Sequence, residues 1–192
     1  MEGFVAKRHL VFKPPLKHLL RGFAFEGSSF NKDSFYVCAF VMPLCVPKEH
    51  LSFTFGDRVR DLNGADRWNV GMPNLIENLS AALKRDAVTF ISRIESVSDF
   101  IGYAKSGPRT LRNLEGVGYS LARNGQISEA CAIFDELLAM VDLSNSWQRE
   151  LAGEVNRLKD VLTQAPENVR AQLAASESET IHKLGLYEFR DA

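Results

Sequence analysis

Cysteine, net charge and long apolar runs are all scarce in this sequence. Its three cysteines are Cys38, Cys45 and Cys131, an odd number without the paired spacing of a disulfide framework or a zinc site. We therefore expect a cytoplasmic protein with no metal. A net charge of −1 argues against a protein that binds nucleic acid through bulk charge alone.

No apolar run approaches the roughly 20 residues that cross a bilayer. The N-terminal stretch mixes Lys, Arg and His among its apolar residues, so it lacks the uninterrupted apolar region of a signal peptide. We therefore expect no membrane association. With 45% apolar and 24% charged residues, the composition is typical of a globular domain and not of a disordered chain.

Catalytic motifs are also absent. There is no Gly-x-Ser-x-Gly elbow, and Gly116 and Gly118 lie in a helical pattern with no strand before them, which excludes a phosphate-binding loop. Cys131 lies among apolar residues, where packing is the expected role. The sequence favours a protein without catalytic activity or cofactor, and leaves open an enzyme with an unrecognised site.

The N-terminal region is predicted to contain one interrupted helix and a small sheet. Apolar residues at spacings of three to four predict a helix that restarts at Pro14-Pro15 and ends at Gly22. From Phe23 to about Arg60, abundant Phe, Val and Tyr predict a meander of roughly three strands, and the alternation of Leu51–Phe55 predicts one buried face.

The C-terminal half is predicted to be helical throughout. A single apolar stripe predicts a long helix over 73–104, which Ser106-Gly107-Pro108 ends. Further helices are predicted over four segments: 108–123, 128–141, 144–164 and 166–184. The predicted fold class is therefore α+β, with an N-terminal helix plus a small antiparallel β-meander (1–70) followed by an all-helical region (71–192), in one compact unit.

The segment at about 110–142 resembles a single tetratricopeptide repeat, a helical hairpin. Gly118, Gly125, Ala130 and Phe134 fall at the spacings of that pattern. The resemblance implies that Gly118 and Ala130 let the two helices approach, that Phe134 fills the space between them, and that Gly125 makes the turn. It leaves open whether the face of the hairpin binds a partner or is covered by the flanking helices.

The opening of the chain has a second resemblance, carried by short groups of Phe, Lys and Gly: Phe12-Lys13-Pro14, Leu16-Lys17, Gly22-Phe23, Gly27 and Phe30. This order is similar to a family of bacterial domains of unknown function, which begin with a helix ending in Gly-Phe and continue into a small sheet. The resemblance implies a bacterial accessory protein and no particular activity.

The most polar segment follows the predicted sheet and is the first candidate for a functional surface. It alternates carboxylates and guanidiniums and ends on a tryptophan: Asp57, Arg58, Arg60, Asp61, Asp66, Arg67 and Trp68. Arg and Trp are frequent anchors in protein interfaces, and recognition residues concentrate on loops. The segment could instead bind a divalent cation or a phosphate, or form a solvated loop of ion pairs that contribute little to stability.

A second candidate lies near the N-terminus. Lys13, Lys17 and Arg21 step by four, so a helix would place them on one face, where they could contact a phosphate backbone. The other interpretation is the solvated face of an amphipathic helix.

These patterns rank three functions. We predict first a non-enzymatic protein–protein interaction subunit or adaptor of a bacterial complex, in the manner of an accessory to a defence or toxin–immunity module, with a protein partner. The alternatives are a nucleic-acid-associated protein that uses the basic N-terminal segment and an enzyme with its site in the 57–68 loop. The oligomeric state stays open.

Overall fold

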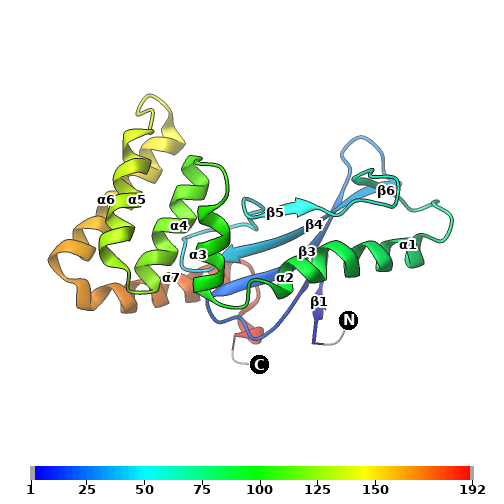
Figure 1. Cartoon of the computed structure of the whole chain (residues 1–192), viewed down its shortest axis with the longest axis horizontal. Coiled ribbons are helices and arrows are strands. Elements are labelled where there is room, and N and C mark those ends of the chain that lie inside the picture. Colours follow the sequence, from blue (N-terminus) through cyan, green and yellow to red (C-terminus); the bar gives the residue numbers. More distant parts are fainter. Residues whose placement is uncertain (1–2, 191–192) are drawn as a thin grey trace. The chain divides into compact units, whose positions relative to one another are not determined.

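The structure is a computed structural model that describes residues 3–190 and divides into two compact units. The sheet unit contains residues 3–42, 51–95 and 188–190, and the helical unit contains residues 43–50 and 96–187. In Figure 1 the strands run from blue to cyan and the helices of the helical unit from green to orange. Each unit therefore includes a short segment from a distant part of the chain.

The sheet unit is built on a six-stranded antiparallel sheet with the order β1-β2-β3-β4-β5, in which β6 also pairs with β4. Its strands are β1 Val5–Lys7, β2 Leu10–Phe12, β3 Leu19–Gly27, β4 Ser34–Pro43, β5 Gly56–Arg58 and β6 Arg67–Asn69. Since β5 and β6 pair with different parts of β4, they share one edge of the long strand. The segment Leu51–Phe55, predicted as a strand, precedes β5 without joining the sheet.

The predicted N-terminal helix is wrong, because residues 5–22 contain β1, β2 and the start of β3. Leu10 and Phe12 are buried while Val11 between them is partly exposed, which is the alternation of a strand. Arg8 has a positive φ of 55° in the turn between β1 and β2, a conformation that a helix does not contain. The helix implied by the resemblance to bacterial domains is likewise not found there. The class α+β remains.

Helices cover one face of the sheet. They are α1 Leu75–Ala82, the π-helical stretch η1 Leu83–Val88 and α2 Thr89–Ser92. A buried apolar cluster joins them to the sheet: Phe23, Val37, Ala39, Val59 and Trp68 from the sheet side, and Ala82, Leu83, Ala87 and Ile91 from the helices. Alternate residues of β4 enter this cluster, so the same face of the strand is apolar along its length.

The long helix predicted over 73–104 is interrupted after Ser92. Ser96 begins the next helix, since its side chain accepts a hydrogen bond from the backbone N–H of Asp99 while the Asp99 carboxylate accepts one from the backbone N–H of Ser96. This reciprocal capping box fixes a helix start. The two units also meet in sequence at this point, between residues 95 and 96.

The helical unit surrounds one central helix. Its helices are α3 Val97–Lys105, α4 Leu111–Arg123, α5 Ile127–Ala139, α6 Ser146–Gln164, η2 Pro166–Asn168 and α7 Val169–Lys183, and a last turn, η3 Tyr187–Phe189, continues into the sheet unit. Contacts from α3, α5 and α7 reach α4, and every residue from Asn113 to Ala122 is buried. A helix that is buried all round must have its polar side chains satisfied inside the unit.

The predicted hairpin corresponds to α4 and α5. Gly118 of α4 lies directly against the ring of Phe134 of α5, so that a Cβ on residue 118 would collide with the ring. Ala130 is fully buried, and Gly125 makes the turn with a φ of 81°. The close approach of the two helices therefore depends on the missing side chain at Gly118.

Replacing Gly118 with alanine should lower the free energy of unfolding by about 1–3 kcal/mol, because overpacking outweighs the better helix propensity of alanine. The matched control is Gly102 on α3, which is exposed and has no atom within 4 Å of an added Cβ. Gly102→Ala should raise the stability by up to about 1 kcal/mol. Urea unfolding of both variants measures the difference, and equal effects would show that Phe134 can move aside.

Candidate functional site

The described residues contain neither a candidate metal cluster nor a candidate membrane span. Within residues 3–190, no group of three or more His, Cys, Asp or Glu side chains is placed to hold a metal ion. No helix in that range combines the length and apolar character that crossing a membrane requires.

Two residues of the predicted 57–68 surface are buried and belong to the interior of the fold. Trp68 is fully buried in the core, and its indole N–H donates to the carbonyl of Val59 at 3.0 Å. Asp61 is also buried, and its carboxylate accepts from the backbone N–H groups of Asn63 and Ala65, both at 2.8 Å. These two side chains close the turn between β5 and β6 and are not available to a partner.

The arginines of that segment are exposed, and two of them share a face of the sheet. Arg58 pairs with Cys38 and Arg67 pairs with Tyr36, two positions on the same face of β4. The guanidinium of Arg58 lies 4.0 Å from the centre of the Tyr36 ring and donates to Asp66 at 2.7 Å. Because this ion pair is exposed and internally neutral, it offers little net attraction.

The remaining members of the predicted surface point elsewhere. Asp57 pairs with Ala39, so it lies on the opposite face of the sheet from Arg58. Arg60 is exposed, and its backbone carbonyl accepts a hydrogen bond from Arg85 at 2.8 Å. The structure therefore brings together Arg58, Asp66 and Arg67 and separates the others.

Cys38 and Cys45 lack the environment of a nucleophile. Burial, followed by the nearby carboxylate of Glu26, raises the pKa of Cys38, whose sulfur lies 3.7 Å from Glu26 Oε2. Burial raises the pKa of Cys45 to about 12. Both thiols therefore stay protonated at neutral pH, the unreactive form.

The three basic residues near the N-terminus do not form one face. Lys13 lies 3.8 Å from a carboxylate oxygen of Glu95, and Arg21 donates to the carbonyl of Ile94 at 3.0 Å. Lys17 is exposed in the connection between β2 and β3. The predicted helix that would place these residues on one face is absent, because the segment forms β2, β3 and the connection between them.

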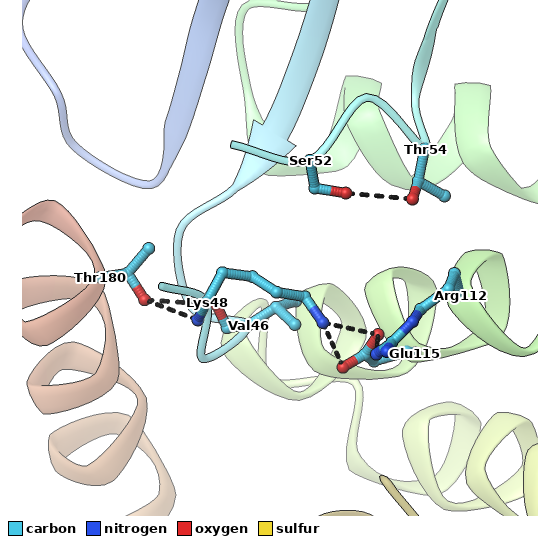
Figure 2. Close-up of polar contacts among 7 residues, drawn as sticks. All are labelled: Val46, Lys48, Ser52, Thr54, Arg112, Glu115 and Thr180. Atoms are coloured by element: carbon cyan, nitrogen blue, oxygen red, sulfur yellow. Dashed lines mark hydrogen bonds and ion pairs between the residues drawn. The ribbon is translucent and has the colours of Figure 1, made fainter. Parts of the chain in front are cut away.

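The sequence did not indicate the polar interior of the helical unit, which involves the segment 43–50 between β4 and β5. Its residues Leu44, Cys45 and Val46 are buried. The hydroxyl of Thr180 on α7 donates to the carbonyl of Val46 at 3.3 Å and accepts from the backbone N–H of Lys48 at 3.4 Å (Figure 2). A segment without helix or strand is thus held among the helices through its backbone.

Lys48 of the same segment forms an ion pair with the central helix, α4. Lys48 Nζ donates to both carboxylate oxygens of Glu115 on α4, at 2.8 and 3.0 Å, and Arg112 Nη1 donates to the same carboxylate at 3.0 Å (Figure 2). Only 2% of the Glu115 side chain is exposed. Two cations and one buried carboxylate therefore form a network that also fixes the position of Arg112.

Arg112 connects this network with residues exposed at the surface. Its guanidinium lies 4.7 Å from the centre of the Trp147 ring at the start of α6. Trp147 is 38% exposed, and Met140 and Leu143, in the connection before it, are 46% and 62% exposed. We call Arg112, Met140, Leu143 and Trp147 the Trp147 surface.

Hydrogen bonds order the connection that presents these side chains. The Asp142 carboxylate accepts from the backbone N–H and hydroxyl of Ser144, at 2.9 and 2.7 Å, and these bonds lower its pKa. The backbone N–H of Asp142 donates to the side-chain oxygen of Gln148 at 2.7 Å. The exposed apolar side chains therefore sit on a structured turn, which reduces the entropy cost of binding.

Comparisons with known proteins identify no similar protein. No protein-family model matches the sequence, and no curated protein or solved structure is significantly similar to it.

Proposed function

We propose that the protein is a non-enzymatic interaction subunit that contacts a protein partner through the Trp147 surface. The observation that carries the proposal is an exposed tryptophan with an arginine guanidinium over its ring, preceded by two further exposed apolar side chains in the connection between α5 and α6. Trp and Arg are enriched among the residues that dominate binding energy, and exposed apolar side chains that lie together mark interaction sites.

In this proposal the tetratricopeptide-like hairpin supports the contact surface and does not itself form a binding groove. Its first helix, α4, is buried along ten consecutive residues, and the network of Lys48 and Glu115 occupies part of its surface. A partner would therefore meet the corner between α5 and α6, where Met140, Leu143 and Trp147 are exposed. The role in a bacterial complex rests on the resemblance of the opening residues alone.

Replacing Trp147 with alanine should abolish co-purification of the partner, because the variant removes the largest side chain of the surface. The tagged protein is purified from the cells that naturally make it, and the bound proteins are quantified by mass spectrometry. The matched control is Tyr103→Ala on α3, an aromatic of similar exposure at 39%, which should retain the partner. A partner retained equally by both variants, or no partner for the wild type, would contradict the proposal.

A further inference from the structure

Arg112 of the Trp147 surface belongs to an ion-pair network that has one more cation than carboxylates. Lys48 and Arg112 both pair with Glu115, and within residues 3–190 neither has a second carboxylate at ion-pair distance. Two cations and one carboxylate leave an excess of one positive charge. Of the two cations, Arg112 is the more exposed, at 43% of its side chain against 22% for Lys48. Arg112 is therefore the cation of this network that a partner can reach more easily.

Arg112 also has donors to spare. It donates to Glu115 through Nη1, while its Nε and Nη2 make no hydrogen bond to the rest of residues 3–190. Arg109, three residues earlier, differs because the Glu136 carboxylate accepts from two of its nitrogens. A guanidinium presents five N–H donors in a planar fork that matches a carboxylate. Of these two arginines, Arg112 is the one that can take a further carboxylate.

On the basis of the proposed function, we infer that the partner contributes an acidic protein segment. An Asp or Glu carboxylate of the partner binds the free edge of Arg112, and an adjacent large apolar side chain packs on Met140, Leu143 and Trp147. The apolar contacts supply most of the affinity, and the carboxylate supplies selectivity. A basic or uncharged segment is disfavoured because it offers no carboxylate to the Arg112 donors that are not used by Glu115.

A displayed library of random peptides, selected on the full-length protein, tests this inference. Peptides recovered on the wild type should combine Asp or Glu with a neighbouring Trp, Phe, Leu or Met. A synthetic copy of the most enriched peptide should bind Arg112→Gln about tenfold more weakly, the loss expected for one charge-assisted hydrogen bond. Arg112→Lys, which keeps the charge but loses the planar fork, should bind more weakly than wild type and more tightly than Arg112→Gln. Raising the salt concentration should weaken the wild type more than Arg112→Gln.

The control for bulk charge is Arg170→Gln, which removes an exposed arginine of α7 and should leave peptide binding unchanged. If peptides that depend on Trp147 show no excess of Asp and Glu, or bind Arg112→Gln as tightly as wild type, the acidic partner is excluded while the proposed function stands. If no recovered peptide loses binding in Trp147→Ala, the inference and the proposed contact surface both fail.

Discussion

Replacing Trp68 with alanine is expected to lower the free energy of unfolding of the sheet unit by about 3–5 kcal/mol, the usual cost of removing a fully buried tryptophan. Trp68 is fully buried, and its indole N–H donates to the carbonyl of Val59. The variant loses the apolar contacts with the core cluster and leaves that carbonyl without its donor. Urea unfolding followed by circular dichroism measures the change.

Trp147 is the matched control, since the chain has two tryptophans and the other one is 38% exposed. Trp147→Ala should cost about 1 kcal/mol or less, the range of surface substitutions with one partly buried contact. Trp68→Phe separates the two causes of the loss, because it keeps most of the ring volume and removes only the N–H donor, at about 1 kcal/mol. Equal losses for Trp68→Ala and Trp147→Ala would contradict the burial of Trp68.

The position of Trp68 could not be predicted from the sequence. It belongs to β6, which is three residues long and has no period that a pattern search can detect. The residues before it are rich in Asp, Arg, Asn and Gly, a composition typical of a loop. Its burial follows from pairing with Phe35 in β4, more than 30 residues away, and only the folded sheet reveals that contact.

The N-terminal strands were missed for a related reason. The apolar residues of this segment fit a helical spacing on paper, yet Leu10 and Phe12 are buried on one face of β2. In strands as short as β1 and β2, three residues each, the two periods are nearly indistinguishable. Partners in neighbouring strands decide the outcome, since Leu10 pairs with Ala24 and Phe12 pairs with Gly22.

The helices after residue 108 were predicted well because they are long enough for the period to be clear, whereas the one predicted over 73–104 is interrupted after Ser92. The predicted helix over 108–123 corresponds to α4 Leu111–Arg123, and the one over 144–164 to α6 Ser146–Gln164. The polar network between them was not predictable. Lys48 and Glu115 are 67 residues apart, and no local pattern marks a lysine that binds a buried carboxylate. The candidate surface, in contrast, contains a tryptophan and an arginine, two residue types that the sequence alone associates with interfaces.

Replacing Glu115 with alanine is the second change with a large expected effect, a loss of about 3 kcal/mol in the stability of the helical unit. Removing one partner of a buried ion pair typically costs about 3–5 kcal/mol, and the lower end applies because Lys48 keeps 22% exposure. The variant leaves the Lys48 ammonium without its carboxylate and opens a cavity beside α4. Hydrogen exchange of the α4 amides measures the loss.

Glu49→Ala provides the control, because Glu49 follows Lys48 in the chain and forms an exposed ion pair with Lys183 at 3.1 Å. It should cost less than about 1 kcal/mol, the range of surface pairs. The double variant Lys48→Met with Glu115→Leu should be more stable than Glu115→Ala, since it removes both charges and fills the space with apolar atoms. If the double variant is less stable than Glu115→Ala, the cost of burying an unpaired charge does not dominate the loss of stability.

Glu115→Ala and the double variant together also separate stability from recognition. Glu115→Ala removes the carboxylate that holds Nη1 of Arg112, so the guanidinium over Trp147 loses its anchor. The double variant restores packing but not that anchor. If the partner recognises a positioned Arg112, the double variant should therefore recover the stability of the helical unit while binding an acidic peptide more weakly than wild type. Equal binding would show that Trp147 alone is sufficient to orient the guanidinium.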